Sequence, residues 1–330
     1  MSETPAATTP LQEAFVRLRE ELTRGIIGQP HLVECLLIAL LADGHLLVEG
    51  APGLAKTTAI KALATRVEAD FHRIQFTPDL LPADLTGTDI FRSQTGTFEF
   101  ERGPLFHNIV LADEINRAPA KVQSALLEAM AERQITIGRR TWPLPDLFMV
   151  MATQNPIEQE GTFALPEAQL DRFLMHVTIG YPDAEAELAI LRLARQQARE
   201  VMHPAPPPAH MLRPADVFAA RDAVLSVHMA APLELYITQL VVATREAGKY
   251  GAELARWIAW GASPRATIAL DRCARAHAWL AGRDYVLPED IHAIAHEVLR
   301  HRVLPSYEAE AEGVRVDTVI DRLLDLVPLP

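Results

Sequence analysis

The chain has 330 residues, of which 49% are hydrophobic, and this is enough to build about two domains with their own cores. Its 31 Lys and Arg residues are outnumbered by 43 Asp and Glu residues, which leaves a net charge of −12 with histidine neutral. The composition excludes a disordered chain, and the acidic surplus argues against a surface built to bind nucleic acid. Net charge does not, however, exclude a local basic channel.

The cysteines and the apolar runs exclude further classes of protein. Cys35 and Cys273 lie far apart, without the spacing of a disulfide framework or a zinc site, so we expect two reduced, partly buried thiols. The longest apolar run, residues 35–42, falls well short of the roughly 18 residues of a membrane span. Residues 1–10 lack the basic start and apolar segment of a secretory signal, so the expected location is the cytoplasm, without membrane insertion.

Residues 11–202 carry the alternating pattern of an α/β domain. After a flexible tail at residues 1–10, helical spacing begins at Leu11 and ends at Gly25. Short apolar runs then alternate with helix-forming segments, and these runs fall at residues 45–50, 71–76, 108–114, 147–155 and 175–180. Near-continuous apolar strands of this kind predict a parallel sheet of five strands with helices on both faces.

Two segments interrupt this alternation. Residues 91–100 and 134–144 alternate apolar and polar side chains around a glycine, which is Gly96 in the first segment and Gly138 in the second. This pattern predicts two β-hairpins inserted between the core elements. Periodicity alone leaves open that the hairpins are ordinary decoration of the surface.

A proline-rich stretch separates the two domains. Residues 203–214 contain five prolines in twelve positions, so this segment cannot continue a helix, and we place a linker at residues 203–213. Residues 214–330 have helical spacing throughout, with good helix starts at Pro264 and Pro288. The second domain is therefore predicted to be all-helical.

The first chemical motif follows the strand at residues 45–50. Its residues are Gly50, Ala51, Pro52, Gly53, Leu54, Ala55, Lys56, Thr57 and Thr58. A loop of small residues at a helix N-terminus lets backbone N–H groups face phosphate oxygens. In this pattern Lys56 reaches the β- and γ-phosphates, and the Thr57 hydroxyl is a ligand of Mg²⁺. Ala55 stands where the pattern has glycine, which we expect to be tolerated because a residue entering helical geometry needs no positive φ.

The second motif is a pair of adjacent carboxylates, Asp113 and Glu114, at the end of the strand at residues 108–114. Ligands of open α/β sheets bind at the carboxyl ends of the strands, where this pair lies. Asp113 can hold Mg²⁺ through its hydration shell, while Glu114 polarises the attacking water. A solvated turn is the ordinary alternative, but the phosphate loop upstream favours the catalytic interpretation.

Four motifs in this order, GAPGLAKT, LADEINRAP, ATQNPIEQEGTFALPEAQLDRF and GASPRA, resemble the MoxR family of AAA+ ATPases. The resemblance extends from GIIGQ, residues 25–29, to the C-terminal helices, and Ala55 in the phosphate loop is typical of the family. It implies an AAA+ core with both hairpins inserted and an all-α lid domain. It also implies ATP and Mg²⁺ as ligands.

The resemblance assigns roles to polar residues outside these two motifs. Asn155 corresponds to the first sensor, whose amide can donate to the γ-phosphate and accept from water; an Asn-Pro turn is the alternative. Arg172 corresponds to the arginine finger, which reaches the nucleotide of a neighbouring subunit; a salt bridge to Asp171 or Glu167 is the alternative. Arg265, at a helix start, corresponds to the second sensor.

A further segment resembles the one that packs around adenine in the family, and a helix-terminating turn is its alternative interpretation. Its residues are Ile26, Ile27, Gly28 and Gln29. Arg117, in the motif EINRAP, is expected at a subunit boundary. These assignments are implied by the resemblance and place residues that are far apart in sequence around one nucleotide.

The resemblance also implies partners. MoxR-like proteins form rings, expected here to be hexamers with ATP between subunits, and they remodel protein clients, often together with proteins that carry a von Willebrand factor A domain. A nucleotide-gated scaffold with incidental turnover is one alternative, but Glu114, Asn155 and Arg172 together argue against it. A motor like magnesium chelatase subunits or replicative helicases is another. The charge of −12 and the few basic residues of the hairpins argue against nucleic-acid binding.

Three histidines near the C-terminus suggest a metal site at first sight. His292, His296 and His301 lie close to Glu297, but three residues separate Glu297 from His301. This spacing misses the H-E-x-x-H pattern of metalloproteases. We therefore expect a partly exposed helix face here, without a bound metal.

Overall fold

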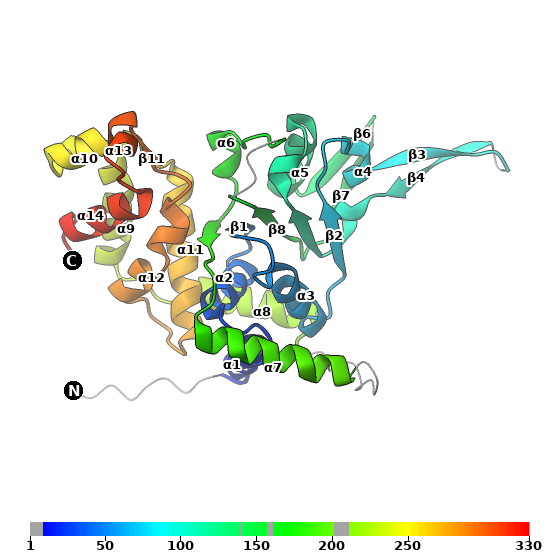
Figure 1. Cartoon of the computed structure of the whole chain (residues 1–330), viewed down its shortest axis with the longest axis horizontal. Coiled ribbons are helices and arrows are strands. Elements are labelled where there is room, and N and C mark those ends of the chain that lie inside the picture. The colour runs from blue at the N-terminus through cyan, green and yellow to red at the C-terminus, as the bar shows by residue number, and fades with distance from the viewer. Residues whose placement is uncertain (1–8, 95, 139, 157–160, 201–210, 330) are drawn as a thin grey trace.

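The chain was analysed as a computed structural model, which describes residues 9–94, 96–138, 140–156, 161–200 and 211–329 (Figure 1). The predicted tail at residues 1–10 and the predicted linker at residues 203–213 lie mostly outside the described residues. At the described end of the linker, the backbone N–H groups of Met211 and Leu212 both donate to the carbonyl of Arg66. This contact ties the start of the second domain to the first.

A five-stranded parallel sheet forms the N-terminal part, as the apolar runs predict. Its strand order is β2-β5-β8-β1-β9. The strands are β1 (Leu46–Glu49), β2 (Phe71–Gln75), β5 (Ile109–Asp113), β8 (Met149–Gln154) and β9 (Met175–Thr178). Every residue of β5 is buried, because helices cover the sheet on both faces.

Alternate residues of the central strand β1 point into two cores on opposite faces of the sheet. Leu46 and Val48 belong to one hydrophobic cluster, and Leu47 belongs to the other. Helices α1 (Pro10–Gly25), α2 (Pro30–Leu41) and α3 (Lys56–Arg66) contribute buried residues to the first cluster, and α5 (Ala120–Glu132) contributes buried residues to the second.

Both predicted hairpins are present. The first, β3 (Gly87–Arg92) and β4 (Thr97–Arg102), follows the short helix α4 (Pro82–Thr86) and projects from the body of the molecule (Figure 1). The second is formed by β6 (Gln134–Ile137) and β7 (Arg140–Pro143). The two hairpins touch through the rings of Phe100 and Trp142, which stack with centroids 4.8 Å apart. This contact places the two hairpins side by side.

The second domain is helical, in agreement with the sequence pattern. The long helix α7 (Ala184–Glu200) lies in sequence between the sheet and this second domain. The main helices of the second domain are α8 (Pro214–Leu225), α9 (Ala231–Arg245), α11 (Pro264–Leu280), α12 (Pro288–Leu299) and α14 (Val316–Leu326). Two short helices, α10 (Ala252–Trp257) and α13 (Tyr307–Ala311), and an antiparallel pair of strands, β10 (Ile258–Trp260) and β11 (Leu304–Pro305), complete it. Helical spacing did not predict this strand pair.

The lid is fixed to the sheet by a buried arginine. The Arg302 side chain is only 3% exposed and pairs with Asp171, with Nε 2.8 Å from Oδ1. It also donates to the carbonyl of Phe173 over 2.6 Å, next to strand β9. A buried charge is tolerated only when its hydrogen bonds are satisfied, as they are here.

Among the helices that the structure describes, none combines the length and the apolar character needed to cross a bilayer.

Candidate nucleotide site

The phosphate-loop motif forms the turn between β1 and α3. Gly53 has a φ of +85°, which favours glycine, and a Cβ added to Gly50 would lie 2.4 Å from Ile179. No side chain caps the start of α3. The first N–H groups of this helix therefore point toward the loop without an internal partner, as an anion site requires.

Ala55 corrects one expectation from the sequence. It has φ 58° and ψ 16°, which is left-handed backbone, so it has not yet entered helical geometry. For a residue with a Cβ this conformation costs roughly 1 kcal/mol. The loop geometry thus demands a positive φ at this position, and the alanine is accommodated at the cost of local strain.

Lys56 lies inside the site that the motif predicts. Its Nζ donates to the carbonyl of Gly50 over 2.6 Å. Burial lowers the pKa of Lys56, while the nearby carboxylates Asp113, Glu114 and Glu49 act in the opposite direction. The ammonium group is therefore held close to the loop and to both carboxylates of the second motif.

Asp113 is held by two residues that the sequence analysis did not identify. Thr153 Oγ1 donates to its Oδ1 over 2.6 Å, and Arg73 Nη2 donates to its Oδ2 over 2.7 Å. Oxygen ligands of this kind suit Mg²⁺, and Thr57 lines the same cavity. Asp113 and Thr57 would hold Mg²⁺, which would supply charge stabilisation on the phosphates. Arg73, however, competes with a cation for Asp113.

Glu114 adopts strained backbone at the end of the strand. Its φ is 57°, and its N–H donates to Thr153 Oγ1 over 2.9 Å. Its carboxylate oxygen Oε2 accepts from Gln75 Nε2 over 2.7 Å and from Arg117 Nη1 over 3.1 Å. Non-glycine residues in this conformation cluster at functional sites. Arg117, which the resemblance predicts at a subunit boundary, contacts the candidate catalytic acid of its own chain.

One cavity of about 340 Å³ brings most of the predicted residues together. It is lined by Pro52, Gly53, Leu54, Ala55, Lys56, Thr57, Thr58, Arg73, Asp113, Glu114 and Asn155. Asn155, which is buried, follows β8, the neighbour of both β1 and β5. Strand order, which the sequence does not reveal, thus places the three motifs side by side.

A second cavity, of about 550 Å³, adjoins the phosphate loop and has an apolar wall suited to an adenine base. Ile27 and Gln29 line it, as the resemblance implies, whereas the side chain of Ile26 is buried in the hydrophobic core. The opposite wall is formed by residues that the sequence analysis did not identify, namely Tyr181, Pro182, Ile190 and Leu191. In the sequence, the apolar residues of the segment that forms α7 were the available signal for this wall of the cavity.

Arg172 and Arg265 lie elsewhere, in a cavity of about 320 Å³ that they share with Arg133 and Arg272. Arg172 precedes strand β9, whereas Gly50 follows its parallel neighbour β1. The two positions are therefore at opposite edges of the sheet, separated by at least one strand length of about 13 Å.

The partner of Arg172 differs from the salt-bridge alternative. Its Nη1 donates to the carbonyl of Leu127 over 2.7 Å, and Asp171 instead pairs with Arg302 and with the hydroxyl of Ser263. Arg265 is exposed at the start of α11. Arg172 and Arg265 thus line one cavity, and Arg172 lies at the sheet edge opposite the phosphate loop of the same chain.

The three C-terminal histidines have separate partners. His292 bonds to the hydroxyl of Tyr236, and His296 bonds to Asp321. His301 is buried and bonds to the carbonyl of Phe173. Within the described part of the chain, no group of three or more His, Cys, Asp or Glu side chains is arranged to hold a metal.

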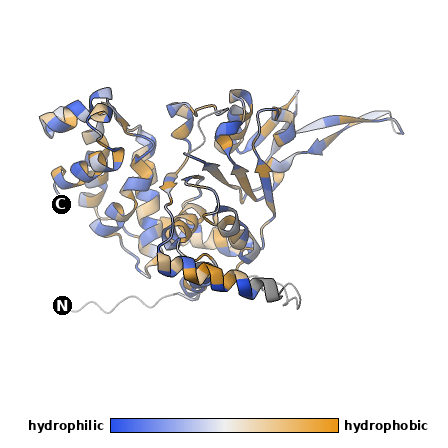
Figure 2. Ribbon diagram, viewed as in Figure 1, coloured by the Kyte–Doolittle hydropathy of each residue, from blue (hydrophilic) through white to orange (hydrophobic). Residues whose placement is uncertain are grey.

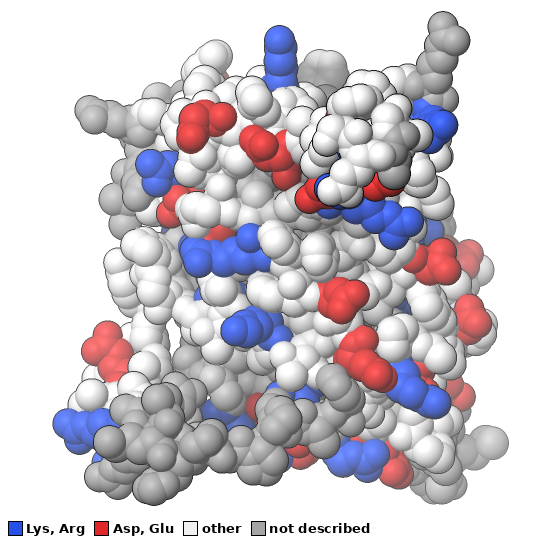
Figure 3. Space-filling view, turned by 90° about the vertical axis from the view of Figure 1, so that its right-hand side faces the viewer, with Lys and Arg blue, Asp and Glu red and all other residues white. Residues whose placement is uncertain are grey.

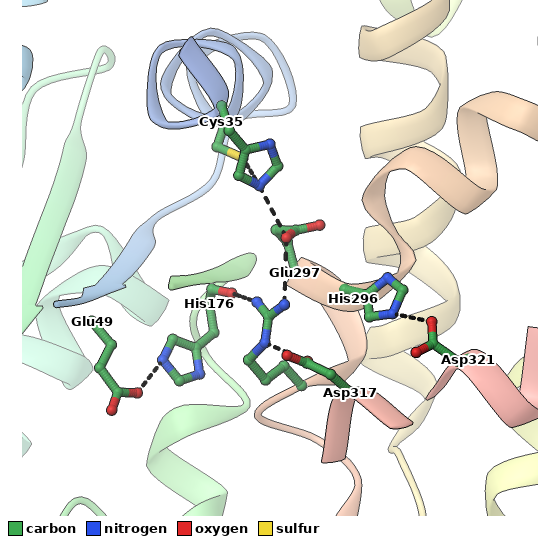
Figure 4. A network of polar contacts seen from close by, with 9 residues as sticks. Cys35, Glu49, His176, His296, Glu297, Asp317 and Asp321 are labelled. Atoms are coloured by element: carbon green, nitrogen blue, oxygen red, sulfur yellow. Dashed lines mark hydrogen bonds and ion pairs between the residues drawn. The ribbon is translucent and has the colours of Figure 1, made fainter. Parts of the chain in front are cut away.

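A polar network links the phosphate-loop strand to the lid (Figure 4). His176 donates to Glu49, the residue before Gly50, over 2.9 Å, and this hydrogen bond lowers the pKa of Glu49. The carbonyl of His176 accepts from Arg300 of the lid over 2.6 Å. Arg300 also pairs with Asp317. The strand that leads into the phosphate loop is therefore connected to the lid through His176 and Arg300.

Comparisons with known proteins agree with this geometry. Residues 45–175 match the family described as ATPase family associated with various cellular activities (AAA), and residues 254–323 match the AAA lid domain. The chain is 46% identical over 312 residues to Chaperone MoxR1 of Mycobacterium tuberculosis, covering 94% of this chain and 81% of that protein.

Two further comparisons cover almost the whole chain. Protein MoxR of Methylorubrum extorquens is 33% identical over 347 residues, covering 98% of each chain. A crystal structure of a candidate ATPase from Cytophaga hutchinsonii is 46% identical and superposes with a TM-score of 0.88, covering 97% of this chain and 96% of that one.

Proposed function

Because the chain belongs to the MoxR family of AAA ATPases, we propose that it hydrolyses Mg²⁺-ATP at sites shared between neighbouring copies of a hexameric ring. One observation carries this proposal. Lys56, Asp113 and Glu114 lie at the carboxyl edge of the sheet, whereas Arg172 and Arg265 lie in a cavity at its amino edge. A chain built in this way has both halves of an ATPase site but cannot join them by itself.

The residues of the carboxyl edge can perform the first part of the reaction. The phosphate loop and Lys56 bind and orient the phosphates, and Thr57 and Asp113 position Mg²⁺. Glu114 accepts a proton from the attacking water, while Asn155 orients that water against the γ-phosphate. Tyr181, Ile27 and Ile190 surround the base in the apolar cavity.

The residues of the amino edge supply positive charge from the neighbouring copy. Arg172 stabilises the charge that develops on the transferred phosphoryl group, and Arg265 contacts the same nucleotide. Rotational symmetry around a closed ring repeats this heterologous contact at each interface. Hydrolysis would then be sensed by the lid, which carries Arg265 at one end and Arg300 at the β9 contact.

Mixing experiments test the shared site. Lys56→Ala and Arg172→Ala chains should each be inactive alone, whereas an equal mixture should recover about a quarter of the wild-type rate, because a random ring pairs intact halves at one interface in about four. Mixtures of Lys56→Ala with Glu114→Gln are the matched control, since both changes damage the same half, and they should recover nothing. Equal recovery in both mixtures, or none in either, would contradict the proposal.

The proposed role of turnover is remodelling of protein clients, together with a partner that carries a von Willebrand factor A domain. Support comes from the β3–β4 hairpin, where Phe91 and Phe98 are 54% and 69% exposed and lie 5.2 Å apart. Figure 3 looks at the end from which this hairpin projects and shows acidic and basic side chains interspersed over that face. An exposed aromatic pair among mixed charges suits polypeptide better than a phosphate backbone.

The two alternatives predict different kinetics. A nucleotide-gated scaffold would show a steady-state rate near zero even with its partner added. A nucleic-acid motor would show turnover that DNA stimulates and that falls steeply with salt. The proteins that co-purify with a Glu114→Gln chain would identify the client, because this change blocks hydrolysis and prolongs the ATP-bound complex.

A further inference from the structure

Helix α5 buries one polar side chain, Gln123, among apolar ones. Figure 2 shows hydrophobic and hydrophilic residues on this helix, and its buried hydrophobic residues all belong to the second cluster. The structure describes all of α5, and Gln123 is the only polar residue among those that the helix buries. Its oxygen Oε1 has no hydrogen-bond partner among the described residues, which is costly for a buried carbonyl group. Packing alone therefore does not explain a glutamine at this position.

The amide nitrogen of Gln123 bonds to two separate segments of the chain. Its Nε2 donates to the carbonyl of Ile115 over 3.2 Å and to the carbonyl of Phe163 over 3.0 Å. Two facing carbonyls fix the orientation of the amide, because only its NH₂ end can donate. Ile115 directly follows Glu114 at the end of β5, and Phe163 lies on the segment that follows β8 and Asn155. Gln123 therefore joins the chain segments that follow two neighbouring strands of the sheet.

A backbone hydrogen bond joins the same two segments. The N–H of Phe163 donates to the carbonyl of Asn116 over 2.6 Å. The side chain of Phe163 is 43% exposed, so the attachment is made by its backbone and not by its ring. We name these three hydrogen bonds, two from Gln123 and one from Phe163 to Asn116, the Gln123 clamp.

The clamp holds the backbone beside a strained residue. Glu114 has a φ of 57°, and such backbone persists only where its surroundings hold it in place. On one side, the N–H of Glu114 donates to Thr153 of β8 over 2.9 Å. On the other side, Gln123 holds the carbonyl of the next residue. Gln75 bonds to the carboxylate of Glu114 itself, whereas Gln123 fixes the backbone that aims this carboxylate.

We propose that Gln123 is a positioning residue for ATP hydrolysis, which acts by holding the backbone that aims Glu114 at the attacking water. This inference rests on the proposed function, in which Glu114 accepts the proton of that water. A reacting group misplaced by about 1 Å can lose about 100-fold in rate. Gln123 lines neither the phosphate cavity nor the apolar cavity beside it. Its loss should therefore slow the chemical step and leave nucleotide binding unchanged.

Gln123→Met tests the proposal, because methionine has a similar length but no donor. We expect kcat for ATP to fall at least about tenfold, while KM and the affinity for a fluorescent ATP analogue stay within about twofold of the wild type. Gln12→Met is the matched control, since Gln12 is also buried and its Nε2 donates to the carbonyl of Trp279, but it lines neither cavity. A wild-type kcat in Gln123→Met, or an equal loss in Gln12→Met, would overturn the proposal.

Two changes at Phe163 test the clamp without altering the core. Phe163→Pro removes the N–H that bonds to Asn116, whereas Phe163→Ala removes only the exposed ring. We expect the proline chain to lose kcat as Gln123→Met does, and the alanine chain to keep the basal rate. This pair decides the question even if Gln123→Met does not fold. Equal rates in the two chains would show that the backbone bond has no part in positioning Glu114, and the clamp would be wrong.

A double-mutant cycle separates this inference from the proposed function. If Gln123 acts through Glu114, Gln123→Met should lower the residual single-turnover rate of a Glu114→Gln chain by less than about twofold. A loss as large as in the wild-type background would show that Gln123 acts elsewhere, so that the inference falls and the proposed site stands. Wild-type turnover in Glu114→Gln itself would overturn the proposed function and this inference with it.

Discussion

Gln75 donates a hydrogen bond of 2.7 Å from Nε2 to the Oε2 atom of Glu114, the carboxylate proposed to activate water. Gln75 ends β2, and the chain continues from there through α4 into the projecting hairpin. The restraint on Glu114 therefore originates on the strand that leads to the proposed client surface. Loss of this bond would leave Arg117 as a donor to the same oxygen.

Removing the Gln75 donor should raise basal turnover. In Gln75→Leu, Glu114 retains Arg117 but loses one charge-assisted hydrogen bond, and we expect the ATPase rate without client to rise roughly tenfold, equivalent to about 1.4 kcal/mol. Steady-state phosphate release measures it. Gln134→Leu, on the exposed start of β6, is the control and should leave the rate unchanged. A lower rate in Gln75→Leu would show that Gln75 aligns Glu114 instead of restraining it.

Replacing Arg73 should lower the Mg²⁺ requirement. Its guanidinium occupies the Asp113 oxygen Oδ2, so a cation must displace it before it can interact with that carboxylate. In Arg73→Gln we expect the Mg²⁺ concentration for half-maximal turnover to fall roughly fivefold, which corresponds to about 1 kcal/mol. A titration of the rate with MgCl₂ at constant ATP measures this. The same titration on Arg24→Gln, an exposed residue of α1, serves as control, and an unchanged midpoint for Arg73→Gln would rule out competition.

Acid should destabilise the protein through His45. Burial lowers the pKa of His45 to about 4, and its ring accepts from the N–H of Val150. The unfolded chain takes up this proton near pH 6.5, so between about pH 6.5 and pH 4 the unfolded state binds more protons and stability falls as pH falls. The expected loss for this group is about 2 kcal/mol between pH 7 and pH 5.

Urea unfolding at both pH values checks the effect. His45→Gln keeps an acceptor and a donor but does not titrate, so its stability should fall less between pH 7 and pH 5 than that of the wild type. His228→Gln replaces an exposed histidine and should behave as the wild type does. Burial also lowers the pKa of His301, so part of the acid sensitivity should persist in His45→Gln. Equal slopes in all three chains would refute the assignment to His45.

Replacing the two exposed aromatic residues of the β3–β4 hairpin with serine should abolish the stimulation of ATP turnover by protein clients. Phe91 and Phe98 pair across β3 and β4 far from the phosphate site, so Phe91→Ser with Phe98→Ser should leave the basal ATPase rate within about twofold and the fold intact. The stimulation by a permanently unfolded protein, casein, should be lost. Thr88→Ser with Ile90→Ser, on the opposite face of the same hairpin, is the matched control. Stimulation that survives in the aromatic variant would place client binding elsewhere.

Local patterns were sufficient for the elements and for the phosphate chemistry. Strands β1, β5 and β8 are apolar because both faces of the sheet are covered. A run of consecutive apolar residues is visible in the sequence without knowledge of the fold. The loop from Gly50 to Thr58 and the pair Asp113 and Glu114 are equally local, because a strand that ends in such a motif leads directly to the carboxyl edge. The helices of residues 214–330 follow from spacing, whereas the strand pair β10 and β11 does not.

Relations between distant segments were decided only by the tertiary structure. The order β2-β5-β8-β1-β9 places Arg73 and Gln75 beside Asp113 and Glu114, although nothing in FHRIQF distinguishes them. The positive φ of Ala55 and the burial of Ile26 depend on how the loop and α1 pack. The sequence motifs identified Arg172 as a candidate but did not give its position relative to Lys56. The parallel pairing of β1 with β9 places Arg172 at the opposite edge of the sheet from Lys56, because the direction of a strand decides which edge each of its ends reaches.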